Sequence, residues 1–162
     1  MPNWTRWLGL SAMVILLDQL TKFWVTSRFQ LGDSVAITSF FNMVLAYNTG
    51  AAFSFLADAG GWQRIFFTAI AVIAAIVIVV LLRKPQNHRL FNAALALILG
   101  GALGNLVDRM LLGHVVDFIQ VHAADYYWPA FNIADSAITI GAALLIWDSF
   151  RKPAQPGLAR RR

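Results

Sequence analysis

Residues 65–82 form one continuous apolar segment, IFFTAIAVIAAIVIVVLL, without a charged side chain. A membrane-crossing helix needs about 20 mostly apolar residues, because the hydrocarbon core of a bilayer is about 30 Å thick. Backbone N–H and C=O groups find no water in that core, so a crossing segment must satisfy them within itself, as a helix does. The segment therefore predicts a transmembrane helix and limits the rest of the chain to folds that are built in a membrane.

Composition and three further apolar segments extend this prediction. The 162 residues are 59% hydrophobic and 13% charged, whereas soluble domains average about 45–50% apolar and about 25% charged residues. Asp18 and Lys22 interrupt the first apolar segment, which lacks a cleavage site of small residues, so we interpret it as a retained span and not as a removed signal peptide. We predict a mostly α membrane protein, a single domain over 1–162, with four transmembrane helices at about 7–27, 63–82, 90–110 and 131–150.

The basic residues predict the orientation of these helices. They gather next to apolar segments, at Arg83, Lys84 and Arg89 and again in the tail after residue 150. Lys and Arg are enriched in cytoplasmic loops, where they meet anionic lipid headgroups. Both termini are therefore expected in the cytoplasm, and the segments at about 29–61 and 111–130 on the extracytoplasmic side. The Pro- and Gly-containing tail 153–162 is expected to be disordered.

The same distribution of charge bears on binding partners. The net charge of +5 is explained by contact with membrane lipids, and the chain has no basic face interleaved with stacking aromatics of the kind that binds nucleic acid. We therefore expect membrane lipids, and no nucleic acid, as partners.

The segment from about 30 to 60 differs from the helical segments in composition. It mixes β-branched and aromatic residues with Gly, Asn and Thr, which predicts a small β-rich cradle of short strands at the membrane surface. Asn48-Thr49-Gly50 indicates a turn. A glycine there also lets a ligand approach the backbone, which would leave N–H groups for an extended peptide. An ordinary hairpin turn explains the same three residues.

Polar residues inside the predicted spans form two groups. Asp18 and Lys22 are one helical turn apart, so we expect an intramembrane ion pair that fixes helix packing. Asn105, Asp108 and Arg109 share a face of the third span, where Arg109 can pair with Asp108 or with a carboxylate across the site. The small residues at 100–104 of that span predict close contact with other helices.

Two carboxylates flank the membrane edge between the last two spans. Asp117 lies in the polar loop predicted at 111–130, and Asp135 lies in the first turn of the last span, three residues after Asn132. Two neighbouring carboxylates cannot both ionise easily, so one stays protonated while the other acts as a base on a water molecule. This arrangement predicts hydrolysis by an aspartic dyad.

Three alternatives use the same region. A metal site can be drawn from His114, Asp117, His122 and Asp125, although their spacing fits no helical zinc motif. A Ser/His/Asp triad would use His114 or His122, but no serine stands in a nucleophile elbow. A proton-coupled membrane carrier or binding protein would use the buried carboxylates as a relay. The chain has no cysteine, which excludes thiol nucleophiles.

Five short motifs resemble those of one known family, in the same order and over the same four-span pattern. They are DQLTK at 18–22, YNTGAAFS at 47–54, GGALGNLVDR at 100–109, VVDFI at 115–119 and FNIADS at 131–136. On these motifs the chain resembles the bacterial lipoprotein signal peptidases (signal peptidase II), which are integral-membrane aspartic endopeptidases.

The resemblance implies roles for single residues. It makes Asp117 and Asp135 the catalytic pair, and it implies no metal and no other cofactor. It assigns substrate binding or shaping of the site to Asn48, Gly50, Asn105, Arg109 and Asn132. It assigns structural support to Asp18, Lys22 and Asp108.

The resemblance also implies a substrate and a location. The substrate would be a prolipoprotein that carries a diacylglyceryl-modified Cys, cut just before that Cys. The enzyme would be a multi-pass protein of the bacterial inner membrane with its active site at the extracytoplasmic face, and cyclic lipopeptide antibiotics would occupy that site.

Overall fold

A computed structural model describes residues 4–50, 61–84 and 88–150. These residues form four helices: α1 (Thr5–Thr26), α2 (Trp62–Arg83), α3 (Arg89–Leu111) and α4 (Ile133–Ser149). Every helix end lies within two residues of its predicted position, which confirms the four-helix prediction. In the described part of the chain, α1, α2 and α3 are long and apolar enough to cross a membrane. Helix α4 has 17 residues, near the lower limit for a crossing helix.

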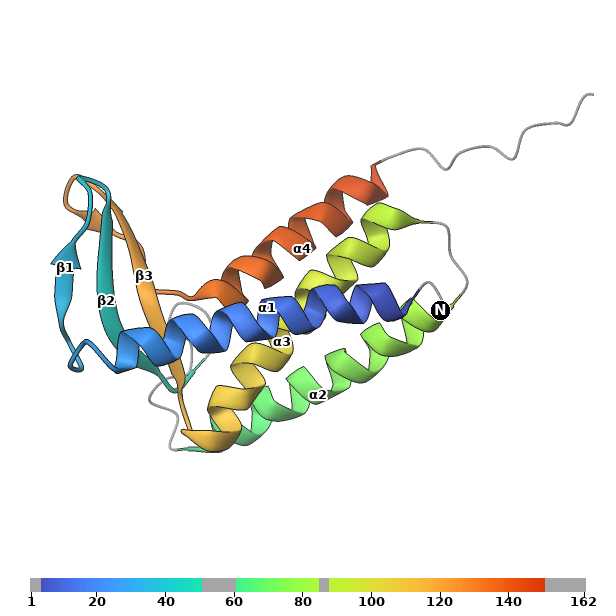
Figure 1. Ribbon diagram of the computed structural model, residues 1–162, viewed down its shortest axis with the longest axis horizontal. Helices are drawn as coiled ribbons and strands as arrows, with labels where there is room; N and C mark the ends of the chain where they lie inside the picture. The colour runs from blue at the N-terminus through green and yellow to red at the C-terminus, as the bar shows by residue number, and fades with distance from the viewer. Residues whose placement is uncertain (1–3, 51–60, 85–87, 151–162) are drawn as a thin grey trace, which may run out of the picture.

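Helix α3 packs against each of the other three helices (Figure 1). Its central residues Ala94, Ala96 and Leu99 are almost completely buried. The outer face of α2 is exposed and apolar, as at Ile65 and Ile73. Because lipid surrounds a crossing helix, an exposed apolar face on α2 is the expected one for a membrane protein.

Glycines set the distance between α3 and its neighbours. A Cβ on Gly100 would lie 2.7 Å from the Cβ of Val14 in α1, and one on Gly101 would overlap the backbone carbonyl of Ala134 in α4. Helices in a membrane associate through van der Waals contact, which small residues bring to its closest approach. The predicted close contacts of the third span are therefore confirmed.

A four-stranded antiparallel sheet covers one end of the helices (Figure 1). Its order is β1 (Ser34–Ala36), β2 (Phe41–Asn48), β3 (Val115–Ala123) and β4 (Tyr126–Tyr127). The first two strands confirm the predicted β-rich cradle, although its residues 51–60 lie outside the described part of the chain, as does the tail 153–162.

The expected loop at 111–130 is wrong, because most of it forms strands β3 and β4. Asp117, Gln120 and His122 give this segment the polar composition of a loop. It nevertheless forms a strand, whose buried residues include Val115 and Val116. Its main partner, β2, comes far earlier in the chain, so no local hairpin pattern marks it.

A small apolar cluster joins the sheet to the helices. Val25 at the end of α1 packs against Leu45 of β2 and against Val116 and Phe118 of β3, and all four are buried. Burying such side chains contributes about 1.5–3 kcal/mol each. The cluster holds β3 next to the ends of α1 and α3, which is where the predicted site residues lie.

The contact between α3 and α4 yields a testable prediction. Gly101→Ala should lower the free energy of unfolding by about 1–3 kcal/mol, because the added methyl meets backbone that cannot move aside. The measurement is the thermal unfolding of the purified protein in detergent.

Gly9→Ala is the matched control for this substitution. Gly9 lies within α1, and an added Cβ would have no atom within 4 Å. The alanine should therefore leave stability unchanged or raise it by up to about 1 kcal/mol. Equal effects of the two substitutions would contradict the role given to Gly101.

Candidate active site

A bulge in strand β2 brings β3 toward the start of α4. Ile119 of β3 pairs with Met43 and Asp117 pairs with Ala46, so two residues of β2 oppose the single residue Phe118. The backbone N–H groups of Phe118 and Ile119 instead donate to the carbonyl of Phe131, at 3.0 and 2.8 Å. Bulges bend a strand and redirect its side chains, and they are common next to active sites. Here the bulge ties Asp117 to the segment that leads into α4.

Asn132 connects the two predicted catalytic carboxylates. It is fully buried, and its side-chain amide donates to Asp117 Oδ1 at 2.7 Å. Its backbone N–H donates to Asp135 Oδ2 at 3.3 Å, while its own Oδ1 accepts the backbone N–H of Asp135 at 2.9 Å. The last two bonds form a capping box at the start of α4, which satisfies N–H groups that a helix start leaves free. One residue thus bonds both carboxylates.

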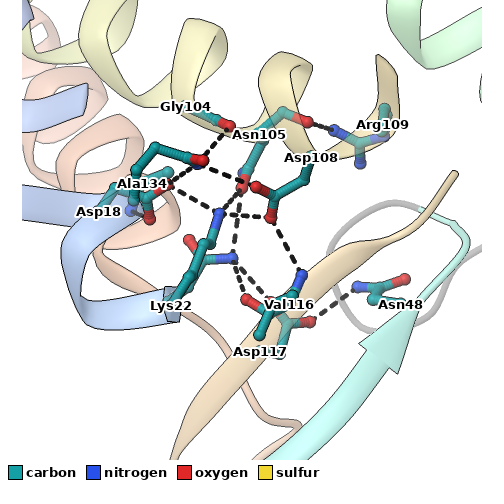
Figure 2. Close-up of polar contacts among 12 residues, drawn as sticks. Asp18, Lys22, Asn48, Gly104, Asn105, Asp108, Arg109, Val116, Asp117 and Ala134 are labelled. Atoms are coloured by element: carbon teal, nitrogen blue, oxygen red, sulfur yellow. Dashed lines mark hydrogen bonds and ion pairs between the residues drawn. The ribbon is translucent and has the colours of Figure 1, made fainter. Parts of the chain in front are cut away.

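Two further asparagines donate hydrogen bonds to the two carboxylates. Asn48 Nδ2 donates to Asp117 Oδ2 at 3.1 Å (Figure 2). Asn105 Nδ2 donates to Asp135 Oδ1 at 2.7 Å, and Asn105 Oδ1 accepts from the amide of Asn132 at 3.2 Å. Each carboxylate therefore has a donor on both oxygens, and its orientation is fixed.

The surroundings of Asp117 favour its protonated form. The side chain lies outside the helices, on β3, and Asp117 is 3% exposed. Burial, followed by the nearby negative charge of Asp135, raises the pKa of Asp117 from 3.8 to about 7, against the lowering effect of the donors Asn48 and Asn132. Desolvation and a like charge both disfavour an ionised carboxyl group. A group with this pKa is suited to proton transfer at neutral pH.

Lys22 lies at the centre of a buried network of polar side chains (Figure 2). Its ammonium is 2.8 Å from Asp18 Oδ2 and 2.8 Å from Asp108 Oδ2, and it donates to Asn105 Oδ1 at 3.0 Å. An ammonium has three donors, and all three are used. The predicted pair of Asp18 and Lys22 is confirmed, with Asp108 as an additional partner.

The two carboxylates that bind Lys22 also hold backbone beside the predicted catalytic residues. Asp18 Oδ1 accepts the N–H of Ala134 at 2.9 Å, and Asp108 Oδ2 accepts the N–H of Val116 at 3.1 Å. Ala134 immediately precedes Asp135, and Val116 immediately precedes Asp117. A single ammonium therefore links the backbone supports of both site carboxylates.

Arg109 makes different contacts from those expected. Asp108 is bound to Lys22, and among the described residues Arg109 makes no ion pair. Its guanidinium donates to the carbonyl of Gly50 at 2.9 Å and lies 5.4 Å from the ring centre of Phe67. Of the two pairings left open, the one with Asp108 is wrong, because the ammonium of α1 lies between the helices and takes that carboxylate. The other, with a carboxylate across the site, does not occur among the described residues. Arg109 instead anchors the end of the turn after β2.

The contact of the Gly50 N–H favours the ordinary turn over the alternative of N–H groups left for a peptide. This N–H donates to the side chain of Asn48 at 2.9 Å, so it is not left for a ligand. This bond holds the Asn48 side chain by its oxygen, while the amide group of the same side chain binds Asp117. The turn therefore orients a donor toward the carboxylate.

The residues of the alternative metal site are dispersed. The ring of His114 stacks on that of Tyr47 with 4.0 Å between the ring centres. The ring of His122 stacks on that of Tyr127 with 4.9 Å between the ring centres. Among the residues that the structure describes, no three His, Cys, Asp or Glu side chains come together as metal ligands would. His114, Asp117, His122 and Asp125 thus do not form one cluster.

Two cavities open at the site, one beside each carboxylate. The larger, of about 530 Å³, is mostly apolar and reaches from Asp135 along α4 to Thr139 and Ile140. The smaller, of about 350 Å³, reaches from Asp117 across the sheet to Asp33. Both volumes fall within the range of small-molecule sites. Asn48, Pro129 and Ala130 line both cavities.

Comparison with known proteins decides the family. The family model described as Signal peptidase (SPase) II matches residues 10–151. The chain belongs to the signal peptidase II family. The prediction of a membrane-bound aspartic peptidase of this family is thereby confirmed.

Curated relatives and solved structures agree with this assignment. The chain is 60% identical to the lipoprotein signal peptidase of Janthinobacterium sp. (strain Marseille), over 90% of this chain and 88% of the relative. It is 61% identical to that of Ralstonia nicotianae, over 90% and 84%. Two bacterial membrane enzyme structures determined by the in meso method resemble it with TM-scores of 0.82 and 0.80, at 34% and 35% identity. The alignments cover 94% of both chains in the first case, and 92% of this chain and 95% of the other in the second.

Sequence reasoning missed one residue of the buried network in this signal peptidase. Gln19 Nε2 donates to Asp108 Oδ1 at 2.9 Å and lies 3.1 Å from Asp18 Oδ2. It therefore helps to satisfy both carboxylates around Lys22. The position of Gln19 between Asp18 and Lys22 in the DQLTK motif could have indicated a role in this network. Its partner Asp108 on α3 could not be identified from the sequence.

The network leads to a stability prediction for Lys22. Lys22→Met should lower the free energy of unfolding by about 3–5 kcal/mol, because Asp18 and Asp108 would stay buried without their counter-charge. Thermal unfolding in detergent measures the loss. Lys84→Met, at an exposed position, removes the same charge and should leave stability within about 0.5 kcal/mol of the unchanged protein. A stable Lys22→Met protein would contradict the role of the ammonium.

Proposed function

We propose that Asp117 and Asp135 are the catalytic pair of this peptidase, and that it cuts diacylglyceryl-modified prolipoproteins just before the lipidated Cys. The observation that carries the proposal is the position of Asn132, which bonds both carboxylates from one residue. Relatives of about 60% identity bear the name lipoprotein signal peptidase, which supports a prolipoprotein as substrate.

The proposed reaction is the addition of water across one peptide bond. Of the two carboxyl groups one is protonated and the other ionised, because like charges this close do not both ionise readily. The ionised carboxylate takes a proton from water, the resulting hydroxide attacks the carbonyl carbon, and the protonated carboxyl donates to the carbonyl oxygen. The C–N bond then breaks, and the amine of the Cys leaves with a proton from the pair. The raised pKa of Asp117 favours this residue as the initial proton donor.

Neighbouring side chains are suited to hold the substrate. Arg109 Nε is buried, and within the described part of the chain it has no hydrogen-bond partner. An unused buried donor is costly unless a ligand satisfies it. We therefore assign a substrate contact to Arg109, and to Asn48, Asn105 and Asn132 the task of orienting the carboxylates.

The larger cavity is suited to the apolar part of such a substrate. It begins at Asp135 and ends at Thr139 and Ile140 of α4, where Ile140 is 53% exposed. Acyl chains and a signal helix can enter from lipid on this side without leaving the bilayer. A cyclic lipopeptide antibiotic has the same mixture of an acyl chain and a peptide, and we infer that it would compete for this cavity.

We further propose that the site faces the extracytoplasmic side of the membrane. Arg83, Lys84 and Arg89 lie at the end of the helices opposite the sheet (Figure 1). Since basic residues favour the cytoplasmic side, the sheet and the carboxylates belong to the other side.

The catalytic pair is tested by substitution. Asp117→Asn and Asp135→Asn should each reduce cleavage of a lipid-modified substrate at least about 1,000-fold, since either change removes the shared proton or the base. The measurement is product formation by purified protein in detergent, followed by mass spectrometry.

Asp125→Asn is the control, because Asp125 is exposed in the turn between β3 and β4. It should retain full activity. An Asp117 or Asp135 variant that turns over normally would remove the dyad. Binding of substrate without cleavage by the unchanged protein would favour the carrier or binding-protein alternative.

The pH dependence follows from the pKa of Asp117. Because that pKa is raised to about 7, the proton of the pair should be lost as the pH rises through this value, and kcat/KM should fall there. The two groups titrate as a pair, so the profile reports their joint behaviour. Asn48→Ala removes a donor to the ionised form and should move the alkaline decline to higher pH. An unmoved decline would contradict the contact with Asn48.

The orientation is tested by labelling, since the chain contains no cysteine. Asp125→Cys should react with a membrane-impermeant maleimide in intact cells, and Lys84→Cys only after the membrane is opened. Both positions are exposed. The reverse pattern of labelling would overturn the proposed orientation.

A further inference from the structure

The smaller cavity differs in kind from the one beside α4. Its described lining residues all come from the sheet and its flanking segments, none from a helix. Several are polar, and the two carboxylates come from opposite sides of β2, since Asp33 immediately precedes β1 and Asp117 lies on β3. Asp33 is exposed and has its Oδ2 bound to the N–H of Gln30 at 2.7 Å. The polar members of the lining are Asp33, Ser34, Tyr47, Asn48, Asp117 and Gln120.

Each of the two cavities contains one of the two site carboxylates. Among the described lining residues, Asp135 belongs only to the cavity beside α4 and Asp117 only to the cavity on the sheet. A chain whose peptide bond meets both carboxylates must therefore pass from one cavity into the other. The crossing lies at the residues that line both, Asn48, Pro129 and Ala130.

The chemistry of a lipid-anchored substrate decides which half enters which cavity. Its acyl chains and signal helix must remain in the bilayer, next to α4. On the proposed extracytoplasmic side, the chain that follows the lipidated residue is the part that leaves the bilayer, and it would meet the sheet. An extended peptide is also suited to the open edge of a sheet, where β1 presents backbone groups on its outer side.

We propose that the cavity on the sheet binds the residues that follow the cut bond, and that Asp33 makes it select against acidic residues there. The inference rests on the proposed function. Asp33 and Asp117 are the charged members of the described lining. An acidic residue at the second or third position after the cut bond would approach Asp33, whereas a lysine would be attracted to it. Asp33 is thus a specificity-determining residue and takes no part in the reaction itself.

The test uses three lipid-modified substrates that differ only at the second and third positions after the cut bond. These positions carry Lys, Ser or Asp. For the unchanged protein kcat/KM should fall in that order, with about a two- to five-fold difference between Lys and Asp, as for an exposed charge pair. The difference should shrink at high salt, because exposed charges are screened.

Variants of the cavity identify the residue responsible. Asp33→Asn should abolish the preference, and Asp125→Asn, an exposed carboxylate outside both described linings, should retain it. Gln120→Lys adds a positive charge to the same cavity and should shift the preference toward Asp. Thermal unfolding checks that each variant is folded.

The outcomes separate this inference from the proposed function. A preference that survives Asp33→Asn, or its absence in the unchanged protein, overturns the role of Asp33 while cleavage lost in Asp117→Asn still supports the dyad. Failure of the unchanged protein to cut any of the three substrates would instead overturn the proposed function.

Discussion

The ion pairs of one buried lysine are the constraint on which the site depends. Lys22 reaches from α1 to Asp18 of its own helix and to Asp108 of α3, and all three side chains are excluded from solvent. Charges at this depth persist only when they are paired and fully hydrogen-bonded. Since the two carboxylates that bind Lys22 also accept backbone N–H groups of α4 and β3, the pairing of these buried charges fixes the positions of the elements that carry Asp117 and Asp135.

The site combines a hydrogen-bonded support with two open cavities. Asparagines hold the carboxylates from helices and from a strand, and the bulge in β2 lets β3 approach α4. The cavities, in contrast, are lined by the sheet, the segment before α4 and the first turns of that helix. The proposed function requires such a division, because the reacting groups must be exact in position while a lipid-anchored substrate would enter from the bilayer.

Local sequence predicted the helices and the β-rich cradle, and it failed where partners were distant. Hydropathy placed all four helices within two residues, because a crossing segment must be helical and long enough whatever its neighbours are. The strand β3 was missed, since its pairing with β2 and not its own pattern makes it a strand. Arg109 was expected to pair with Asp108 or with a carboxylate across the site, but Asp108 is bound to Lys22 and Arg109 donates to the carbonyl of Gly50.

By itself the sequence determined a four-helix membrane protein with a carboxylate on each side of a polar segment at the membrane edge. Only the tertiary structure decided that Asn132 bonds both carboxylates, that Asp18 reaches Ala134 across 116 positions, and that two cavities meet at Asn48. The physical reason is that hydrophobic length acts within one segment, whereas a hydrogen bond depends on the distance between atoms that the fold alone brings together.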